Sequence, residues 1–548
     1  MLELSSTSKS SPWREPLHGP SPGGHAGELL PWARLERFLV LGTTGGVYHA
    51  GHAGHAGHAG HAGAAHEPTD ADAAVVARCL AADGLRTTAR IAAFTGEPAL
   101  FCLAMAAKRG DEQTRRAAYA ALPQVCRTGA ELLRFTAFAE RFGGWGRGMR
   151  KAVGAWLNDR PADDLALQLA RHPAQGGWAH RDLLRLAHPR AASPSHDRLY
   201  SWAVRGELPD GAHEDPACRL IVALDELRRT AEPARAARIV LEHGVPAACV
   251  PAALRAYPEV WEALLPRMPL AELLGDLAAM TRAGLLAPGS RAAAWVVARL
   301  GDAAWVRAAG AAGVHPLALL AAHLGYGAGR GARGQGTWQP VATIADALDA
   351  AFYASFGGVL PMGGRVLLAL DISGSMGSGA VAGVSGLSPR LAGAAMALVT
   401  AATEASHACV AFTAATGGGY GGRWGGGAPG ITAMAISPRE RLDDVVARAG
   451  ALPMGGVDCA LPVRWAHKHR VDVDTFVVYT DHETWAGDVP PAQALRAYRD
   501  ARGIPAKLVV VGMTSTGFSI ADPDDAGMLD VVGLDPSTPP VIADFARA

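Results

Sequence analysis

The stretch LLALDISGSMGSG, residues 367–379, joins an apolar run directly to a cluster of side-chain oxygens. The apolar part predicts a buried strand of a parallel sheet, and Asp371, Ser373 and Ser375 follow where this strand ends. Ligands of open parallel sheets bind at the carboxyl ends of strands, and carboxylate and hydroxyl oxygens suit Mg²⁺. The stretch therefore predicts an α/β domain with a magnesium site, although the same side chains could instead cap the next helix.

Three more strands are predicted further along the chain, in HACVAFTA, DTFVVYTD and AKLVVVGM. Helical patterns separate them, and this alternation predicts a doubly wound parallel sheet with helices on both faces, over residues 361–548. The second of these strands ends in Thr480 and Asp481, so another carboxylate is expected at the same edge. A further loop, PMGGVDC, holds Asp458. The glycine-rich residues 416–430 contain no phosphate-loop lysine and are expected to form a surface loop.

The first half of the chain carries a different pattern. From about residue 70 to about residue 350, apolar residues recur at three-to-four spacing, and Pro, Gly and Asn separate the segments. Many short helices without strands predict a stacked array of the HEAT or armadillo type, which we assign to residues 28–360. Residues 1–27 are expected to be disordered. The repeat HAGHAGHAGHAGHAG, residues 49–63, is interpreted as a flexible loop, with metal binding by its histidines as the alternative.

The 548-residue chain has no net charge, but its charges are unevenly distributed. Residues 101–190 carry 15 Lys and Arg against 8 Asp and Glu, whereas residues 351–548 carry 14 against 18. The basic segment could meet an anionic partner. The seven cysteines are scattered without a CxxC pair, which argues against a disulfide framework and for a reducing compartment. Because no signal peptide or apolar run of bilayer length is visible, we expect a cytoplasmic protein without membrane contact.

The motif DxSxS after an apolar strand, with a second strand ending in TD, resembles the von Willebrand factor A domain and its metal-ion-dependent adhesion site (MIDAS). The resemblance implies that four side chains bind a divalent cation such as Mg²⁺: Asp371, Ser373, Ser375 and Asp481. In that family an acidic group of a partner often completes the coordination, and a threonine from another loop contributes. This chain reads GGVDC where related proteins read GGTDC, so Val457 removes one oxygen, which Asp458 or water could replace.

The two halves together resemble the Ro ribonucleoproteins, in which a TROVE module precedes such an A domain. The resemblance rests on long motifs that begin at about Arg34: RLERFLVLGTTGGVYH, GGWGRGMRKAVGAWLND, GGWAHRDLLRLAHPR, MTRAGLLAPG and YTDHETWAGDVPPAQALRAYRD. It implies that the helices form a ring closed by the A domain. It also implies that small noncoding Y-type RNAs bind the outer face and that 3′ ends of misfolded RNAs enter the hole. The resemblance further implies that a Y RNA links the protein to polynucleotide phosphorylase or another exoribonuclease.

The same resemblance points to candidate RNA-binding residues. His188 aligns with a family histidine and Arg171 with a family lysine implicated in RNA binding, whereas Gln175 replaces an expected arginine. Trp178 is expected to pack in the core. The remaining candidates are neighbours of this segment and cations of the basic segment, any one of which could be an ordinary solvated charge: His180, Arg181, Arg185, Lys108, Arg109, Arg115, Arg116, Arg147, Arg150 and Lys151.

Three functions are compatible with these patterns. The first is a noncatalytic RNA-binding scaffold in RNA quality control and degradation, which is the function that we expect. The second is a Mg²⁺-dependent enzyme acting on RNA. Two-metal phosphoryl chemistry needs several carboxylates around the ions, whereas DxSxS supplies one carboxylate and neutral hydroxyls. The third is a protein-adhesion module that uses the metal site and whose helical half does not bind RNA.

Overall fold

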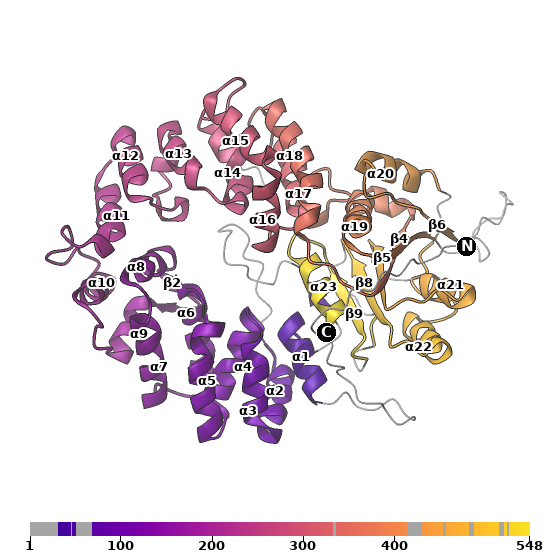
Figure 1. The fold of residues 1–548 in the computed structure, drawn as a ribbon, viewed down its shortest axis with the longest axis horizontal. Helices are drawn as coiled ribbons and strands as arrows, with labels where there is room; N and C mark the ends of the chain where they lie inside the picture. Colours follow the sequence, from indigo (N-terminus) through magenta and orange to yellow (C-terminus); the bar gives the residue numbers. More distant parts are fainter. Residues whose placement is uncertain are drawn as a thin grey trace.

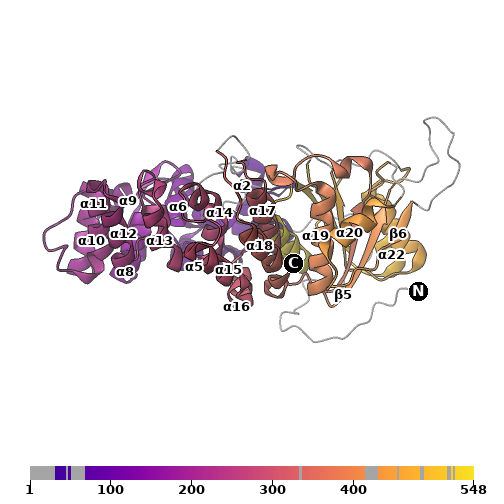
Figure 2. The ribbon, with the colours of Figure 1, turned by 90° about the horizontal axis from the view of Figure 1, so that it is seen from above.

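The computed structural model describes residues 31–44, 47–50, 68–331, 336–413, 430–452, 456–481, 487–514, 520–522 and 525–548. The tail that we expected to be disordered, nearly all of the histidine repeat and nearly all of the glycine-rich loop lie outside these residues. Within the described part, successive helices are arranged in a ring that an α/β unit completes (Figure 1). In side view the helical half is a flat layer with the sheet at one end (Figure 2).

The helical half consists of short helices that pack against their neighbours in the chain, as the spacing of apolar residues predicted. The helices are α1 (Pro31–Leu41), α2 (Asp70–Ala82), α3 (Gly84–Ala92), α4 (Glu97–Arg109), α5 (Glu112–Val125), α6 (Gly129–Phe142), α7 (Arg147–Asn158), α8 (Ala162–Arg171), α9 (His180–Ala187), α10 (Pro194–Arg205), α11 (Arg219–Arg229), α12 (Pro233–His243), α13 (Pro258–Leu264), α14 (Leu270–Arg282), α15 (Arg291–Gly301), α16 (Ala303–Ala311), α17 (Pro316–Gly327) and α18 (Ala342–Ala354). A two-stranded hairpin, β2 (Ala174–Gln175) and β3 (Trp178–Ala179), separates α8 from α9.

Local sequence explains where these helices begin and which of them are central. Thr128 caps α6: its hydroxyl accepts the N–H of Glu131 at 3.2 Å, and the Glu131 carboxylate accepts the N–H of Thr128 at 2.8 Å. All nine residues 99–107 of α4 are buried, because this helix is apolar on all sides. Helix α4 therefore lies inside the layer, packed against α3, α5 and α6.

The second half is a seven-stranded sheet in the order β1-β9-β8-β7-β4-β5-β6, in which all neighbours are parallel except β5 and β6. Its strands are β1 (Val47–His49), β4 (Arg365–Asp371), β5 (Ser406–Phe412), β6 (Ile431–Ala433), β7 (Thr475–Thr480), β8 (Lys507–Gly512) and β9 (Met528–Val532). Its helices are α19 (Pro389–Thr403), α20 (Leu442–Gly450), α21 (Leu461–His469), α22 (Pro491–Arg502) and α23 (Thr538–Arg547). The predicted fold class, a helical ring with a doubly wound α/β domain, is confirmed.

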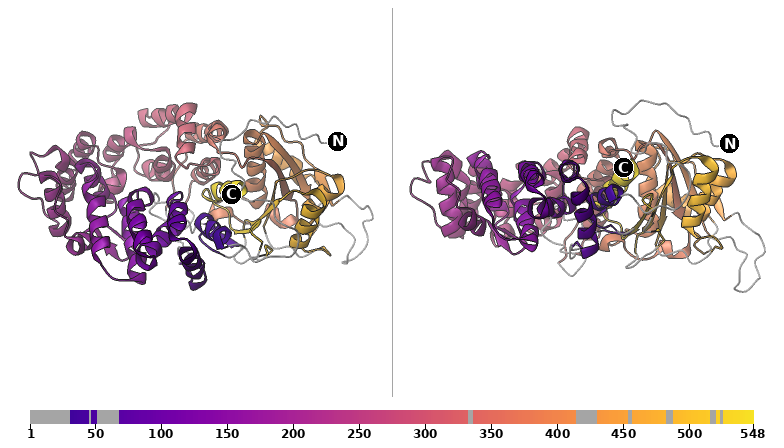
Figure 3. Two further views of the ribbon diagram at one scale, coloured as in Figure 1. Left: turned by 60° about the horizontal axis from the view of Figure 1, so that its bottom comes forward. Right: turned by 90° about the horizontal axis from the view of Figure 1, so that it is seen from below.

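Side chains of the sheet alternate between two apolar clusters, as they must when both faces are covered. Along β4, Leu368 and Leu370 belong to the cluster that continues into α19 and the helical half, whereas Leu367 and Ala369 belong to the cluster beneath α21 and α22. Figure 3 shows the sheet between helices on both sides. Between Arg365 and Asp371, the strand β4 is apolar without interruption, because neither face of this part of the strand meets water.

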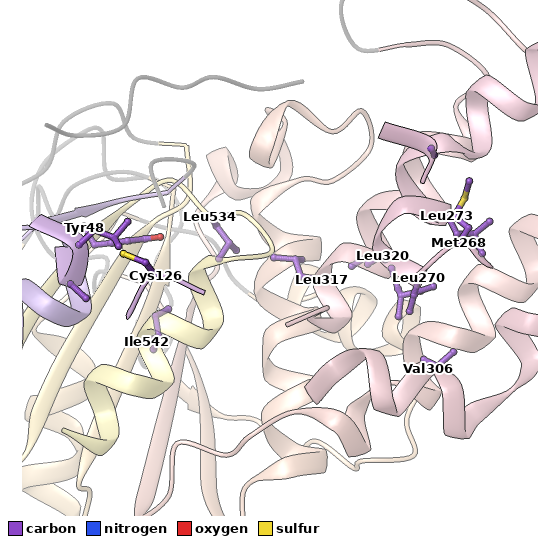
Figure 4. Close-up of a cluster of buried hydrophobic side chains, with 14 of the residues drawn as sticks. Tyr48, Cys126, Met268, Leu270, Leu273, Val306, Leu317, Leu320, Leu534 and Ile542 are labelled. Carbon is purple, nitrogen blue, oxygen red and sulfur yellow. The ribbon is translucent and has the colours of Figure 1, made fainter. Parts of the chain in front are cut away.

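The N-terminal chain contributes to the sheet as well as to the helices. Strand β1 extends the sheet by pairing in parallel with β9, and Arg37 of α1 donates to the carbonyl oxygens of Asp525 at 2.9 Å and Met528 at 2.5 Å. This differs from the sequence prediction, which places residues 47–49 in the helical domain, because a strand of three residues is too short to show a periodic pattern. Figure 4 shows buried side chains from both halves in one cluster, among them Tyr48 and Leu317.

The ring has a second junction, between α18 and α20. The Tyr353 hydroxyl accepts the N–H of Leu442 at 3.0 Å, and Arg441 donates to the carboxylate of Asp349 at 2.7 Å. The Arg441 guanidinium also lies 4.5 Å from the centre of the Tyr353 ring. The sheet is therefore tied to both ends of the helical array.

Two expectations from composition concern cysteines and membranes. All seven cysteines are free thiols, and six of them are buried, which agrees with the absence of a disulfide framework. Among the described residues, no single helix combines the length and apolarity needed to cross a bilayer. One sharply bent pair, α16 with α17, meets the criteria of length and composition only when its two helices are taken together.

Candidate metal and nucleic-acid sites

The predicted metal ligands lie at the carboxyl edge of the sheet, where the chain leaves neighbouring strands in opposite directions. Asp371 ends β4, opposite Phe412 of β5, while Thr480 ends the adjacent strand β7. Asp371, Ser373 and Asp481 are almost completely buried. Since β4 lies between β5 and β7, this edge is the topological switch point at which α/β sheets bind ligands.

Hydrogen bonds fix the geometry of these oxygens. The Asp371 carboxylate accepts the Ser373 N–H and the Thr480 hydroxyl, both at 2.7 Å, and the hydroxyl oxygens of Ser373 and Ser375 lie 3.1 Å apart. Burial, reinforced by the nearby Asp481 carboxylate, raises the pKa of Asp371 to about 6 despite these hydrogen bonds. A cation would offset the cost of burying two carboxylates together, so the donor set fits a divalent metal ion.

The alternative that these residues only cap a helix does not account for the geometry. The segment after Ser373 is a single 3₁₀ turn, residues 374–377, to which the serine side chain makes no capping hydrogen bond. Within the described residues, no group of three or more His, Cys, Asp or Glu side chains is placed to hold a metal. A metal at this edge would therefore depend on the serine hydroxyls as well as on the carboxylates.

The loop that should supply the threonine contributes no side-chain oxygen. Val457 is 2% exposed and belongs to the apolar cluster beneath α21 and α22. The neighbouring Asp458 accepts the N–H of Ala460 at 3.0 Å and lies 3.8 Å from the Arg464 guanidinium, so its carboxylate is engaged at the start of α21. The idea that Asp458 replaces the missing ligand therefore has no support in these contacts.

The predicted RNA-binding residues of α7 form one exposed row. Arg147, Arg150 and Lys151 are three and four residues apart, which places them on the same side of the helix, and all three are exposed. The first turn of α7 contains no acidic residue, and no side chain caps its N-terminus. This end of the helix therefore combines positive side chains with the positive end of the helix dipole.

A second row lies on α9, which packs against α7. Arg181, Arg185 and His188 are exposed at intervals of four and three residues, on the side opposite the buried Leu183 and Leu184. Arg181 lies 3.6 Å from the half-buried carboxylate of its neighbour Asp182, a weak surface pair. We call the six polar side chains of the two rows the α7–α9 surface: Arg147, Arg150, Lys151, Arg181, Arg185 and His188.

Helix α4 contacts the loop before α7 through Lys108, and α5 packs against α7. The Lys108 ammonium donates to the carbonyl oxygen of Gly144 at 2.9 Å, and burial lowers its pKa. Lys108 thus holds the loop before α7 and is only partly available to a ligand. Arg109, Arg115 and Arg116 are exposed, although Arg116 donates to the Glu112 carboxylate at 2.5 Å.

One predicted RNA contact, His180, needs correction, whereas RNA contact by Arg171 stays a prediction. His180 is 3% exposed, because its ring packs under Gly129 at the start of α6; burial lowers its pKa to about 4. It therefore has no surface for direct contact with RNA. Arg171 donates to the carboxylate of Glu272 in α14 at 2.6 Å, so its charge already has an intramolecular partner.

The contact made by Trp178 and the role of Thr480 were not predicted from the sequence. Thr480 belongs with Asp371, Ser373, Ser375 and Asp481, which we call the oxygen cluster. Trp178 is half-buried on β3, with its ring centre 5.8 Å from that of Trp145 in the loop before α7. Both tryptophans follow a pair of glycines, in GGWG and GGWA, a repetition that could have suggested the contact. Thr480 was absent from the predicted ligand set, yet its hydroxyl orients Asp371.

Comparisons with known proteins agree with both halves of this architecture. A TROVE domain model matches residues 22–207 and 237–325, and a Ro60 vWA domain model matches residues 365–546. The RNA-binding protein RO60 of Deinococcus radiodurans is 40% identical over 531 residues, which cover 96% of this chain and 94% of that protein. The RNA-binding protein RO60 of Caenorhabditis elegans is 30% identical over 480 residues, covering 77% and 71% respectively.

A solved structure extends the similarity to three dimensions. The crystal structure of the Deinococcus radiodurans RO (RSR) protein matches with a TM-score of 0.83 at 40% identity, over 94% of this chain and 99% of that one. The sequence similarity spans both halves and the junctions between them. The chain therefore belongs to the Ro60 family, whose members join a TROVE domain to a vWA domain.

Proposed function

We propose that this protein binds structured RNA on the α7–α9 surface and does not cleave it. The observation that carries the proposal is the presence of two exposed, largely cationic rows on helices that pack against each other, because phosphate contacts supply most of the sequence-independent affinity for RNA. The relatives from Deinococcus radiodurans and Caenorhabditis elegans are named RNA-binding proteins, which supports the same function here.

The finer role that we propose is that of a scaffold in RNA quality control. Small noncoding Y-type RNAs are the proposed ligands of the outer surface, and the 3′ ends of misfolded RNAs are the second proposed ligand. The protein would present such RNAs to polynucleotide phosphorylase or another exoribonuclease. The noncatalytic part of the proposal rests on the oxygen cluster, in which Asp371 is accompanied by Asp481 and neutral hydroxyls, fewer carboxylates than two-metal phosphoryl transfer uses.

We further propose that Asp371, Ser373, Ser375 and Asp481 hold Mg²⁺, with Thr480 orienting the first of these ligands. The ion would supply a positive centre for an acidic group of a docking partner. The chain's own part is to keep the Asp371 carboxylate in place through the Thr480 hydroxyl and the Ser373 N–H. With Val457 in the third loop, we expect the ion to be bound more weakly than by a site that has a threonine there.

The test of RNA binding is a fluorescence-anisotropy titration of the full-length protein with a labelled hairpin RNA. The triple substitution Arg147→Ala, Arg150→Ala and Lys151→Ala should weaken binding by on the order of tenfold or more, because it removes three phosphate contacts. A matched control removes three exposed arginines of α11 and α12, Arg228, Arg235 and Arg238, and should leave the affinity within about twofold. Equal losses in both triple variants would contradict the proposed site.

The same RNA tests the absence of catalysis. Wild-type protein incubated with end-labelled RNA and Mg²⁺ should leave the RNA intact. Cleavage that disappears in the Asp371→Ala variant would overturn the noncatalytic assignment and favour a metal-dependent nuclease.

A further inference from the structure

Helix α21, on the side of the sheet away from the helical ring, carries a second basic surface (Figure 1). Its sequence and the residue that follows, LPVRWAHKHR, contain three Lys or Arg and two His but no Asp or Glu. Pro462, Val463 and Ala466 are buried against the sheet. The cations and histidines are therefore exposed on the opposite side, within a half of the chain that is acidic as a whole.

An open pocket of about 670 Å³ lies beside this helix. One wall is the polypeptide at the start of β6, Gly430 and Ile431, and the other wall is α21. The side chains that line the helical wall are Leu461, Arg464, Trp465, His467, Lys468 and His469. The pocket thus combines two permanent cations, two histidines and an aromatic ring in one concave surface.

The aromatic part of the wall consists of two rings that contact each other. The rings of Trp465 and His469, one helical turn apart, have their centres 5.0 Å from one another with an angle of 37° between their planes. Trp465 is half-buried against the apolar cluster beneath the helix, which fixes its orientation, while His469 is exposed. A planar group entering the pocket can therefore pack against a ring whose position is already set.

The charge of the pocket is only partly neutralised from within. The Arg464 guanidinium lies 3.8 Å from the buried carboxylate of Asp458, at the limit of an ion pair, and Lys468 is exposed one turn further along. Cations within reach of an aromatic face are the combination by which proteins hold single-stranded nucleic acids: the cations meet phosphates, and the rings stack on bases.

We propose that the α21 pocket binds a short segment of single-stranded RNA, with phosphates at Arg464 and Lys468 and a base against Trp465 and His469. The site is separate from the α7–α9 surface, which belongs to the helical half on the other side of the molecule (Figure 1). It therefore neither requires the α7–α9 surface nor depends on the metal ligands. An acidic peptide would satisfy the cations but would leave the aromatic wall unused.

The test uses the full-length protein and a fluorescein-labelled oligouridine of about eight nucleotides, a length that one such site can hold. All variants carry Arg147→Ala, Arg150→Ala and Lys151→Ala in addition, so that the α7–α9 surface does not dominate the signal. Arg464→Ala with Lys468→Ala should weaken binding by about tenfold. The control, Arg439→Ala with Arg496→Ala, removes two exposed arginines of the sheet half outside the pocket and should change the affinity less than about twofold.

A second pair of measurements separates base stacking from general anion binding. Trp465→Leu should weaken oligouridine binding by about fivefold to tenfold, the lower part of the range for one stacked base, but should leave displacement by tripolyphosphate unchanged. If thermal unfolding shows that Trp465→Leu destabilises the protein, His469→Ala at the exposed ring takes its place. The proposal is overturned if the Arg464 and Lys468 variant matches the control. It is also overturned if a polyglutamate peptide competes as well as RNA and neither aromatic substitution has an effect.

Discussion

The α7–α9 surface lies in solvent with its side chains spread over two helices, whereas Asp371, Ser373 and Asp481 at the ends of β4 and β7 are buried. Of the four proposed metal ligands, Ser375 is the exposed one, and its hydroxyl oxygen lies 3.1 Å from that of Ser373. Exposed cations keep their hydration and attract a polyanion over several ångströms, so their exact placement matters little. Buried oxygens have lost their hydration, so they depend on fixed geometry and on a compensating cation. RNA binding by the first region should therefore survive the exchange of one cation for another but should depend on salt, whereas the stability of the second region should depend on the metal ion.

The largest expected effect concerns the metal. Because Asp371 is the central carboxylate of the buried cluster, Asp371→Asn should abolish the rise in unfolding temperature that Mg²⁺ gives the wild-type protein. A ligand present at ten times its dissociation constant stabilises the folded state by about 1.4 kcal/mol, which is readily measured in a thermal melt. Asp458→Asn, which alters a nearby buried carboxylate outside the cluster, should retain the effect of Mg²⁺. A Mg²⁺-dependent shift that survives in Asp371→Asn would exclude the cluster as the site.

The next expected effect is on the pH dependence of stability, and it concerns His180, one of two histidines that were predicted to contact RNA. The other is His188. The pKa of His180 is lowered to about 4 in the folded protein, so between pH 6.5 and pH 4 the unfolded chain takes up a proton that the folded chain does not. This contribution to stability is complete above pH 6.5 and is lost as the pH falls, by at most about 3 kcal/mol.

Urea unfolding of wild-type protein and of the His180→Gln variant, at pH 7 and at pH 4.5, would measure this loss. The variant should lose less stability on acidification than the wild type does. His188→Gln is the control for RNA binding, because His188 is exposed at the end of α9; it should weaken RNA binding, whereas His180→Gln should not. The interpretation fails if His180→Gln and wild-type protein lose the same stability between the two pH values.

A smaller effect tests the missing ligand at the sheet edge. Val457→Thr should raise the affinity for Mg²⁺ by about tenfold, because it restores an oxygen to the third loop. The same substitution should lower the free energy of unfolding in EDTA by about 1 kcal/mol, since the hydroxyl enters an apolar cluster. Isothermal titration calorimetry and chemical unfolding give the two values. Val457→Ala also alters the cluster but adds no oxygen, so it should not improve Mg²⁺ binding. The account requires both results: tighter Mg²⁺ binding by Val457→Thr and no tighter binding by Val457→Ala.

The smallest effect concerns Arg171, whose guanidinium is engaged by Glu272. Glu272→Ala should release this arginine and strengthen RNA binding by about twofold to threefold, the scale of one partly exposed ion pair. The double variant with Arg171→Ala should return to the wild-type affinity or below it. If Glu272→Ala has no effect on RNA affinity while Arg171→Ala weakens it strongly, Arg171 binds RNA despite its intramolecular partner.

The sequence predicted the sheet better than it predicted the basic surface, for physical reasons. In the sheet, continuous apolar runs mark buried strands, and parallel pairing brings their carboxyl ends to one edge, so Asp371 and Asp481 could be placed together from sequence. Strand β1 escaped detection because three residues carry no periodicity. In the helical half, exposure and pairing depend on tertiary packing: nothing in the sequence distinguishes the buried His180 from the exposed His188, or reveals that Arg171 meets a carboxylate 101 residues away.

The salt dependence of RNA binding tests the central claim, that exposed cations of α7 and α9 hold RNA phosphates, most directly. The logarithm of the association constant for a hairpin RNA should fall linearly with the logarithm of the salt concentration. The slope should become less steep by about 2 to 3 when Arg147, Arg150 and Lys151 are replaced by alanine, because each phosphate contact contributes about 0.7 to 0.9. An unchanged slope in this variant would contradict the account and place the RNA elsewhere on the molecule.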